Sequence, residues 1–153
     1  MFKQCLAVAA MTLTLAVSVP ARAADFVGDV VGPYLAIQSA LTQDDLKPVA
    51  AAARSLQKNA ERLGGDGKAL VEAAARTAGA KSLEAARAAF GDLSTALIAY
   101  ADNTKQPVDG KIVAFCPMAN KSWVQKDGAI ANPYYGKSMS TCGSKTKSLS
   151  ATQ

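Results

Sequence analysis

Apolar side chains recur at intervals of three and four residues through the segment from about residue 25 to residue 103. This spacing places them on one face of a helix and is the period of an amphipathic α-helix. The pattern stops at Gly64-Gly65-Asp66-Gly67 and again at Gly79, because glycine favours helix ends over helix interiors. The four apolar stripes are Val27, Val30, Tyr34, Ile37 and Leu41; Leu46, Val49, Ala53, Leu56, Ala60 and Leu63; Leu70, Val71, Ala74 and Ala78; and Leu83, Ala86, Phe90, Leu93, Leu97 and Tyr100.

Short polar residues indicate where two of these helices begin. Asp44 and Asp45 precede the second stripe and Ser82 precedes the fourth, and such side chains accept the free amide hydrogens of a helix N-terminus. Pro33 falls within the first stripe, where it either begins the regular helix or bends it. Four amphipathic helices with short connections predict an all-α fold, an antiparallel four-helix bundle. Many inward positions are alanine, which favours close packing of the helices.

The composition supports one domain and excludes several kinds of site. The chain has 153 residues, 50% of them apolar, which is enough for one compact domain. It contains no histidine, which excludes a Ser-His-Asp triad, a histidine-ligated haem and a histidine-containing zinc site. A nucleophilic cysteine would have no histidine base, and there is no Cys-x-x-Cys pair. We therefore expect that the protein is not an enzyme.

The first 23 residues have the parts of a secretory signal peptide. Lys3 supplies a positive charge, residues 5–19 form an apolar run too short to span a bilayer, and Ala21-Arg22-Ala23 has the small-x-small cleavage pattern. We expect cleavage after Ala23 and a soluble periplasmic protein with no membrane span. Loss of Lys3 and Arg22 lowers the net charge from +5 to +3, since 15 basic and 12 acidic residues remain. These charges are scattered, so nucleic-acid binding is not expected.

The composition changes after about residue 103. Residues 112–115 predict one short strand, whereas residues 116–143 show little helical period. Residues 144–153 form a polar Lys/Ser/Thr tail that we expect to be disordered. One domain is therefore expected over residues 24–143, with an irregular segment rich in cysteine, methionine and aromatic residues at its end.

Four sulfur-bearing residues lie at the two ends of this irregular segment. Cys116 and Met118 are at one end, Met139 and Cys142 are at the other, and a turn at Asn132-Pro133 would bring them together. Thiolates and thioethers select soft ions, so these residues are candidate ligands for Cu(I) or Ag(I). Zinc is disfavoured, because a structural zinc site usually takes four Cys or His ligands. Each methionine on its own is also typical of a core filler.

A disulfide is the alternative interpretation of the same cysteines. Two cysteines in an exported domain most often form a disulfide. A bond between Cys116 and Cys142 would close a loop of about 27 residues and stabilise the fold by roughly 3.5 kcal/mol in the chain-entropy model. Trp123, Tyr134 and Tyr135 would then form an aromatic contact surface for a partner. Trp123 equally suits a packing anchor. An oxidised pair offers no thiolates to a metal, so the two interpretations describe different redox states.

In order along the chain, the irregular segment contains three motifs and one isolated aromatic residue: Cys116-Pro117-Met118, Trp123, Asn132-Pro133-Tyr134-Tyr135-Gly136 and Met139-x-x-Cys142-Gly143. With the alanine-rich helical part before it, from about residue 34 to residue 143, the chain resembles the DUF3347 family. The resemblance implies a small exported domain, a type also fused to periplasmic adaptor subunits of heavy-metal efflux pumps. We therefore predict a periplasmic Cu(I)- or Ag(I)-binding protein linked to heavy-metal efflux or resistance. The alternative is a disulfide-stapled module without metal that docks on such an adaptor or on another envelope protein.

Overall fold

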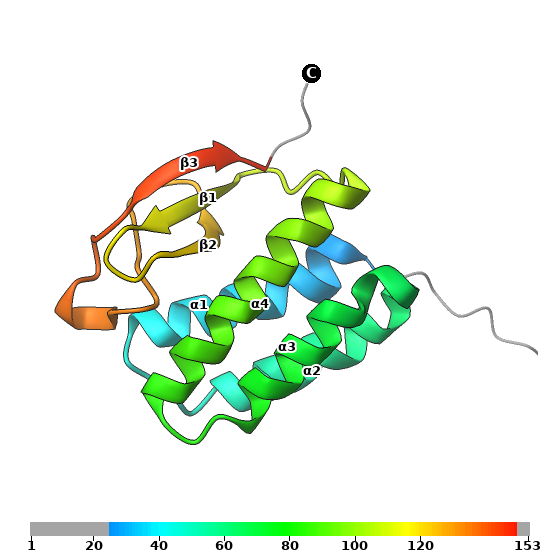
Figure 1. Cartoon of the computed structure of the whole chain (residues 1–153), viewed down its shortest axis with the longest axis horizontal. Coiled ribbons are helices and arrows are strands. Elements are labelled where there is room, and N and C mark those ends of the chain that lie inside the picture. Colours follow the sequence, from blue (N-terminus) through cyan, green and yellow to red (C-terminus); the bar gives the residue numbers. More distant parts are fainter. Residues whose placement is uncertain (1–24, 150–153) are drawn as a thin grey trace, which may run out of the picture.

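In the computed structural model, which describes residues 25–149, four α-helices are followed by a three-stranded antiparallel sheet (Figure 1). The predicted signal peptide with its cleavage site, and residues 150–153, lie outside the described residues. No helix within residues 25–149 is long and apolar enough to span a membrane. The elements are a π-helical turn (Phe26–Val31), α1 (Gly32–Thr42), α2 (Val49–Ala60), a 3-10 helix (Glu61–Gly67), α3 (Lys68–Gly79), α4 (Leu83–Thr104), β1 (Lys111–Cys116), β2 (Lys121–Lys126), a 3-10 turn (Gly136–Ser138) and β3 (Ser144–Ser148).

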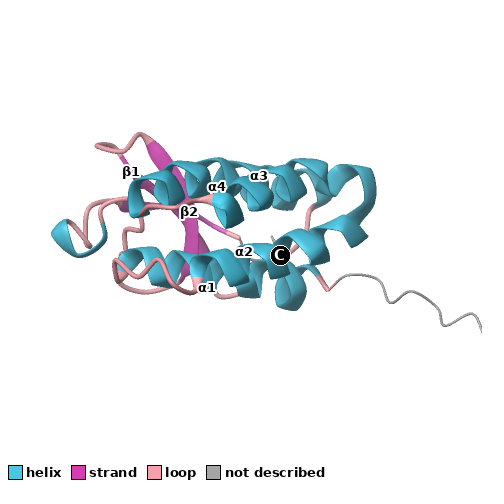
Figure 2. Cartoon of the chain, turned by 90° about the horizontal axis from the view of Figure 1, so that it is seen from below, coloured by secondary structure: helices cyan, strands magenta, loops and turns pink. Residues whose placement is uncertain are grey.

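The all-α prediction is wrong, because the fold is mixed α/β. The four predicted helical segments are present as α1 to α4, but they do not form a bundle closed by helices alone. α1 packs on α2, α2 on α3 and α3 on α4, whereas β2 packs against α4 and also contacts α1. In Figure 2 the strands accordingly run from the row of α4 and α3 to the row of α1 and α2. The sheet thus occupies part of the side on which a bundle would press α1 against α4.

Pro33 marks the start of the regular first helix and does not bend it. A proline has no N–H for the carbonyl four residues earlier, which here belongs to Asp29. That carbonyl instead accepts a 2.7 Å hydrogen bond from the side-chain amide of Asn59 on α2. The N–H of Gly32 donates to the Val27 carbonyl, which is the wider spacing of a π-helical turn. The chain can therefore enter α1 with the freed carbonyl satisfied.

Of the two predicted helix caps, one is confirmed and one is wrong. The Ser82 hydroxyl accepts the Ala85 N–H at 3.1 Å and caps α4. Asp44 and Asp45 cap no helix, because α2 begins only at Val49 and has no side-chain cap. Asp44 instead takes a left-handed backbone conformation with φ of 58°. That conformation turns the chain away from α1 and places its carboxylate near the candidate site described below.

The sheet contains the predicted strand and two that were not predicted. β1 is the central strand, and the order across the sheet is β2-β1-β3. β1 and β2 form an antiparallel hairpin in which Cys116 lies opposite Lys121, so the hairpin turn is residues 117–120. β3 pairs with the other edge of β1, with a bulge between Val113 and Ala114. β1 is rich in β-branched and aromatic residues, which favour strands.

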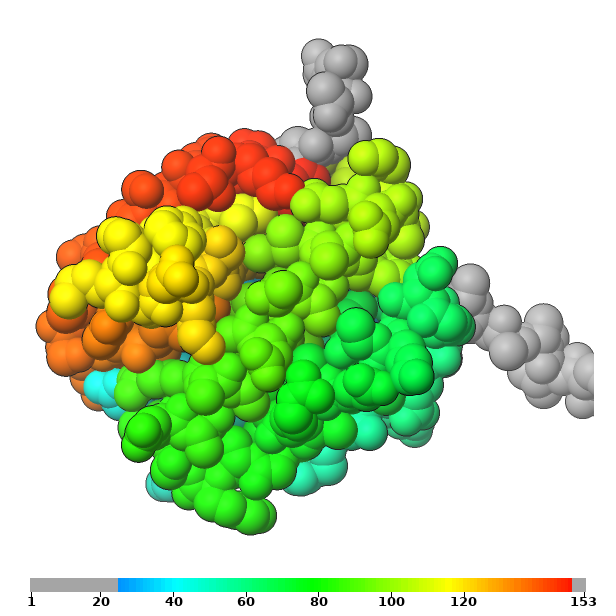
Figure 3. Space-filling model, in the orientation of Figure 1, coloured from blue at the N-terminus to red at the C-terminus, as the bar shows by residue number. Residues whose placement is uncertain are grey.

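β3 corrects the prediction that the chain is disordered from residue 144 onward. All five of its residues, Ser144–Ser148, are exposed, and the strand lies on the outside of the molecule (Figure 3). Its polar sequence offers no apolar side chain to the core, so the strand depends on backbone pairing with β1. Leu149 anchors its end: the side chain is buried, its N–H donates to Lys111 and its carbonyl accepts from Val108.

An aromatic cluster joins the helices to the sheet. The rings of Tyr34 on α1 and Phe90 on α4 stack with centroids 4.9 Å apart. Tyr134 lies 6.0 Å from Phe90 and meets Trp123 on β2 edge to face at 5.9 Å. Tyr34, Phe90 and Trp123 are fully buried. Such pairs add roughly 0.5–1.5 kcal/mol each beyond the burial of their area, so this cluster is a centre of the core.

A hydroxyl contact reinforces the same junction. The buried Tyr34 hydroxyl lies 2.7 Å from the Ser94 hydroxyl on α4 and accepts the Val124 N–H of β2 at 3.0 Å. Val124 lies opposite Val113 of β1, but its N–H points away from β1 and takes the Tyr34 hydroxyl as its acceptor. Burial raises the pKa of Tyr34 well above its ordinary value, which keeps the hydroxyl protonated.

Replacing this hydroxyl tests whether it holds the sheet to the helices. We expect Tyr34→Phe to lower the free energy of unfolding by about 1–3 kcal/mol, because the buried Val124 amide loses its acceptor. Ser94→Ala serves as the comparison, since it leaves the Tyr34 oxygen bonded to Val124 and should cost less. Urea unfolding followed by circular dichroism measures both. Equal stabilities for Tyr34→Phe and the wild type would contradict the assignment.

Candidate functional site

The structure brings Cys116 and Cys142 together. Cys116 ends β1, Cys142 lies two residues before β3, and the two sulfur atoms are 3.2 Å apart. Both are free thiols in this structure. Cys116 is fully buried, whereas Cys142 is partly exposed. The convergence expected from the turn at Asn132-Pro133 therefore occurs at the two cysteines.

The two thiols ionise unequally. Burial raises the pKa of Cys116, but the amides of Ala119 and Met118, the Cys142 thiol and the Asn132 side chain outweigh it and leave that pKa below its ordinary value. The contact with Cys116 raises the pKa of Cys142, and burial adds to the effect. The first proton thus leaves Cys116, and the second is retained on Cys142.

Asn132 organises the loop that carries Cys142. The residue is fully buried, and its side-chain oxygen accepts the N–H groups of Tyr134 at 2.8 Å and Tyr135 at 3.3 Å. Its side-chain amide donates to the Cys142 carbonyl at 2.7 Å, and its own N–H donates to Ser140. A single side chain therefore closes the predicted turn and holds the backbone of Cys142 beside β1.

Two glycines with positive φ make room around this loop. Gly136 has φ of 54°, and a Cβ there would collide with the carboxylate of Asp44. Gly143, with φ of 134°, follows Cys142 directly; a Cβ there would lie 2.7 Å from the Trp123 ring and 2.9 Å from the Phe115 carbonyl. Only glycine lets the chain approach so closely at these two positions.

An arginine clamp ties the same loop to the helices. The Arg87 guanidinium, on α4, donates to the carbonyls of Pro133 at 3.0 Å and Leu41 at 3.2 Å, and it forms an ion pair with Asp44. The Asp44 carboxylate also accepts the Lys137 N–H at 3.3 Å. Sequence reasoning missed this clamp, because residues 43 positions apart carry no local signal of their pairing.

The two methionines differ in solvent exposure. Met118 lies in the hairpin turn just beyond Cys116 and is 61% exposed. Met139 is partly buried, and its carbonyl accepts the Cys142 N–H at 3.1 Å. Both are near the cysteines in the chain, but of the four sulfur-bearing residues only Cys116 is fully buried. No group of three or more His, Cys, Asp or Glu side chains that could hold a metal occurs within residues 25–149.

The three aromatic residues proposed as a contact surface lie mostly in the core. Trp123 is fully buried and its indole N–H donates to Gln125 at 3.0 Å. Tyr134 is 8% exposed and its hydroxyl donates to the Ser122 carbonyl at 2.6 Å. Tyr135 alone of the three is partly exposed. Trp123 is thus a packing anchor, and of the three aromatic residues Tyr135 offers the most surface to a partner.

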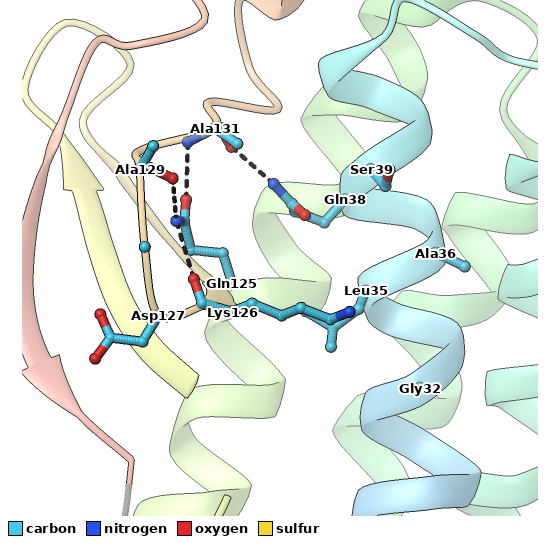
Figure 4. A pocket seen from close by; sticks show the side chains of 11 residues that line it. Gly32, Leu35, Ala36, Gln38, Ser39, Gln125, Lys126, Asp127, Ala129 and Ala131 are labelled. Carbon is cyan, nitrogen blue, oxygen red and sulfur yellow. Dashed lines mark hydrogen bonds between the residues drawn. The ribbon is translucent and has the colours of Figure 1, made fainter. Parts of the chain in front are cut away.

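A separate cleft of about 610 Å³ lies between α1 and the loop after β2 (Figure 4). Gln38 and Gln125 line it, and both are buried. Gln38 donates to the Ala131 carbonyl at 2.7 Å, while Gln125 donates to the Ala129 carbonyl at 2.9 Å and accepts the Ala131 N–H at 3.0 Å. These amides are occupied in holding the loop, and none of the sulfur-bearing residues lines the cleft.

The fold and this site define a mixed α/β domain with a dithiol at the end of a β-hairpin. The sequence model of the family described as "Protein of unknown function (DUF3347)" matches residues 30–108, just over half of the chain, and the chain belongs to that family. The matched residues contain all four helices and end before Cys116. The helical part therefore carries the match, although the motifs on which the resemblance was based lie in residues 116–143. No curated protein and no solved structure matches the chain.

The ion pair beside the site predicts an acid-dependent stability. The hydrogen bond from Arg87 lowers the pKa of Asp44 from its ordinary value of 3.8. A carboxyl whose pKa is lower in the folded state stabilises the fold above its ordinary pKa, and this contribution is lost as the pH falls through the lowered value. We expect Asp44→Asn to be less stable than the wild type at pH 7 and to lose less stability on acidification below about pH 4.

Urea unfolding between neutral and strongly acidic pH measures this difference. Asp45→Asn is the matched control, because it also removes one carboxylate but affects an exposed neighbour outside the Arg87 clamp. Parallel pH profiles for Asp44→Asn and the wild type would show that the ion pair does not contribute.

Proposed function

We propose that this protein binds one soft monovalent metal ion, Cu(I) or Ag(I), through the thiolates of Cys116 and Cys142. The observation that carries the proposal is the 3.2 Å approach of two sulfur atoms from the ends of a 27-residue segment. Thiolate ligands select soft ions. Zinc fits less well, because a structural zinc site draws four ligands and this pair offers two.

The sulfur separation is intermediate between that of a disulfide and that of a metal-bound pair. A disulfide has an S–S length of about 2.05 Å. Two sulfurs on one tetrahedral zinc, each at about 2.3 Å, are about 3.8 Å apart. Because Cys142 lies on a loop and Cys116 ends a strand, a small shift of Cys142 would open the pair to admit an ion.

The neighbouring thioethers suit transfer of the ion. Met139 lies three residues before Cys142 and Met118 two residues after Cys116, so each is in reach as a further soft ligand. Cys142 and Met118 are at the surface, where an incoming sulfur from a partner can replace one ligand while the others hold the ion. We propose that the protein acts in the periplasm and that the recipient is a component of a heavy-metal efflux system.

Cys142→Ser tests the ligand set. Titration of the reduced protein with Cu(I) against a chromophoric chelator, without oxygen, should show affinity at least about 100-fold below the wild type. Loss of an outer-shell partner alone costs about 10–100-fold, and loss of a ligand should cost more. Met139→Leu should have a smaller effect, and Thr141→Ala, at the exposed neighbour, should have none. Unchanged affinity in Cys142→Ser, with unchanged helical circular dichroism, would contradict the proposal.

The same sulfur contact supports a second candidate function, a disulfide-stapled interaction module without metal. Closing the bond needs a movement of about 1.2 Å from the observed separation. Native mass spectrometry of protein purified without reductant distinguishes the two states. One bound copper with both thiols reduced supports the metal site. A metal-free mass two hydrogens lower supports the staple.

A further inference from the structure

The two sulfurs of the candidate site differ sharply in access. Cys116 has no exposed surface, whereas Cys142 lies on the loop before β3 and is partly exposed. Their sulfur atoms are nevertheless in contact at 3.2 Å. A molecule that arrives from solvent can therefore reach the pair only through Cys142.

We propose that Cys142 is the entry point for thiol–disulfide exchange with small external disulfides, and that Cys116 is the resolving thiol. In the first step Cys142 passes its proton to the Cys116 sulfur in contact with it and attacks one sulfur of the external disulfide as the thiolate. A bond forms between Cys142 and that sulfur, the external S–S bond breaks, and the other half leaves as a thiolate. The departing external thiolate then takes up this proton from Cys116. The product is a mixed disulfide on Cys142.

The contact between the sulfurs defines the second step. The Cys116 thiolate attacks the Cys142 sulfur, the new bond joins the two cysteines, and the second half of the external disulfide leaves as a thiolate. The protein loses two electrons and two hydrogens, and the external disulfide is reduced to two thiols. No other oxidant is needed.

The reverse direction uses the same asymmetry. An external thiolate attacks the accessible Cys142 sulfur of the oxidised pair, and Cys116 leaves with the electron pair of the broken bond. The amide groups of Met118 and Ala119 and the side chain of Asn132 surround the departing sulfur. Attack at Cys116 is blocked, because that sulfur is fully buried.

This chemistry goes beyond metal binding and requires no metal. Its test therefore includes a Cu(I) chelator throughout, so that failure of the exchange and failure of the metal proposal are separate results. The protein is used in a Cys5→Ser background, which leaves Cys116 and Cys142 as its only cysteines. The probe is glutathione disulfide, and the readout is intact mass with peptide mapping.

We expect the two single variants to differ. Cys116→Ser should accumulate one glutathionyl group on Cys142, because nothing resolves the mixed disulfide. Cys142→Ser should react at Cys116 at least about tenfold more slowly in the folded state and should react readily in urea. Comparable folded-state rates for the two variants would overturn the proposal.

The Cys5→Ser protein with both other cysteines intact gives a readout that does not depend on the folding of either single variant. Acid quenching within seconds of mixing should trap the mixed disulfide on Cys142, and longer incubation should yield the intramolecular disulfide without an adduct. A trapped adduct on Cys116, or a stable adduct that never resolves, would overturn the assignment of roles.

Discussion

The junction at Tyr34 connects the helices to the sheet, and the candidate site depends on it. The ring stacks on Phe90 of α4, and the hydroxyl accepts the Val124 N–H from the free side of β2. A buried backbone amide without a hydrogen-bond partner would lower the stability by about 1–3 kcal/mol. By accepting this N–H, the Tyr34 hydroxyl allows that edge of β2 to be buried against the helices. With β2 in place, β1 and its terminal Cys116 have a fixed position relative to α1 and α4.

The loop that carries Cys142 is held by contacts to both parts of the molecule. Arg87 bonds its Pro133 carbonyl from the helical side, and Gly143 lies against the Trp123 ring on the sheet side. Asn132 then fixes the backbone of Cys142 from within the loop. The sulfur pair is therefore produced by tertiary contacts around it, and either a metal ion or a disulfide would add to a pairing that already exists.

Much of the candidate site was predictable, because its parts carry local signals. Soft sulfur residues at both ends of a segment, with Asn-Pro between them, predict a loop that folds back. The exposure of the site residues was only partly predictable: Trp123 packs in the core, as one of its two interpretations had it, while Met118 remains at the surface. Pattern alone does not reveal which aromatic residues a core will absorb, since burial depends on the surface that the helices leave uncovered.

The sequence by itself determined the four helices and one strand at residues 112–115, because helix period and β-branched residues act locally. It left open whether Pro33 begins the first helix or bends it, and the structure decided that. Only the tertiary structure decided that the helices do not close as a bundle. β2 has few apolar residues and β3 has only polar ones, so neither strand has a local signal in the sequence. β3 forms because its backbone pairs with the edge of β1 and because Leu149, at its end, is buried in the core. The tertiary structure likewise decided the sulfur contact, because a 3.2 Å approach of residues 26 positions apart requires the strands, the loop and the helices that hold both cysteines in place.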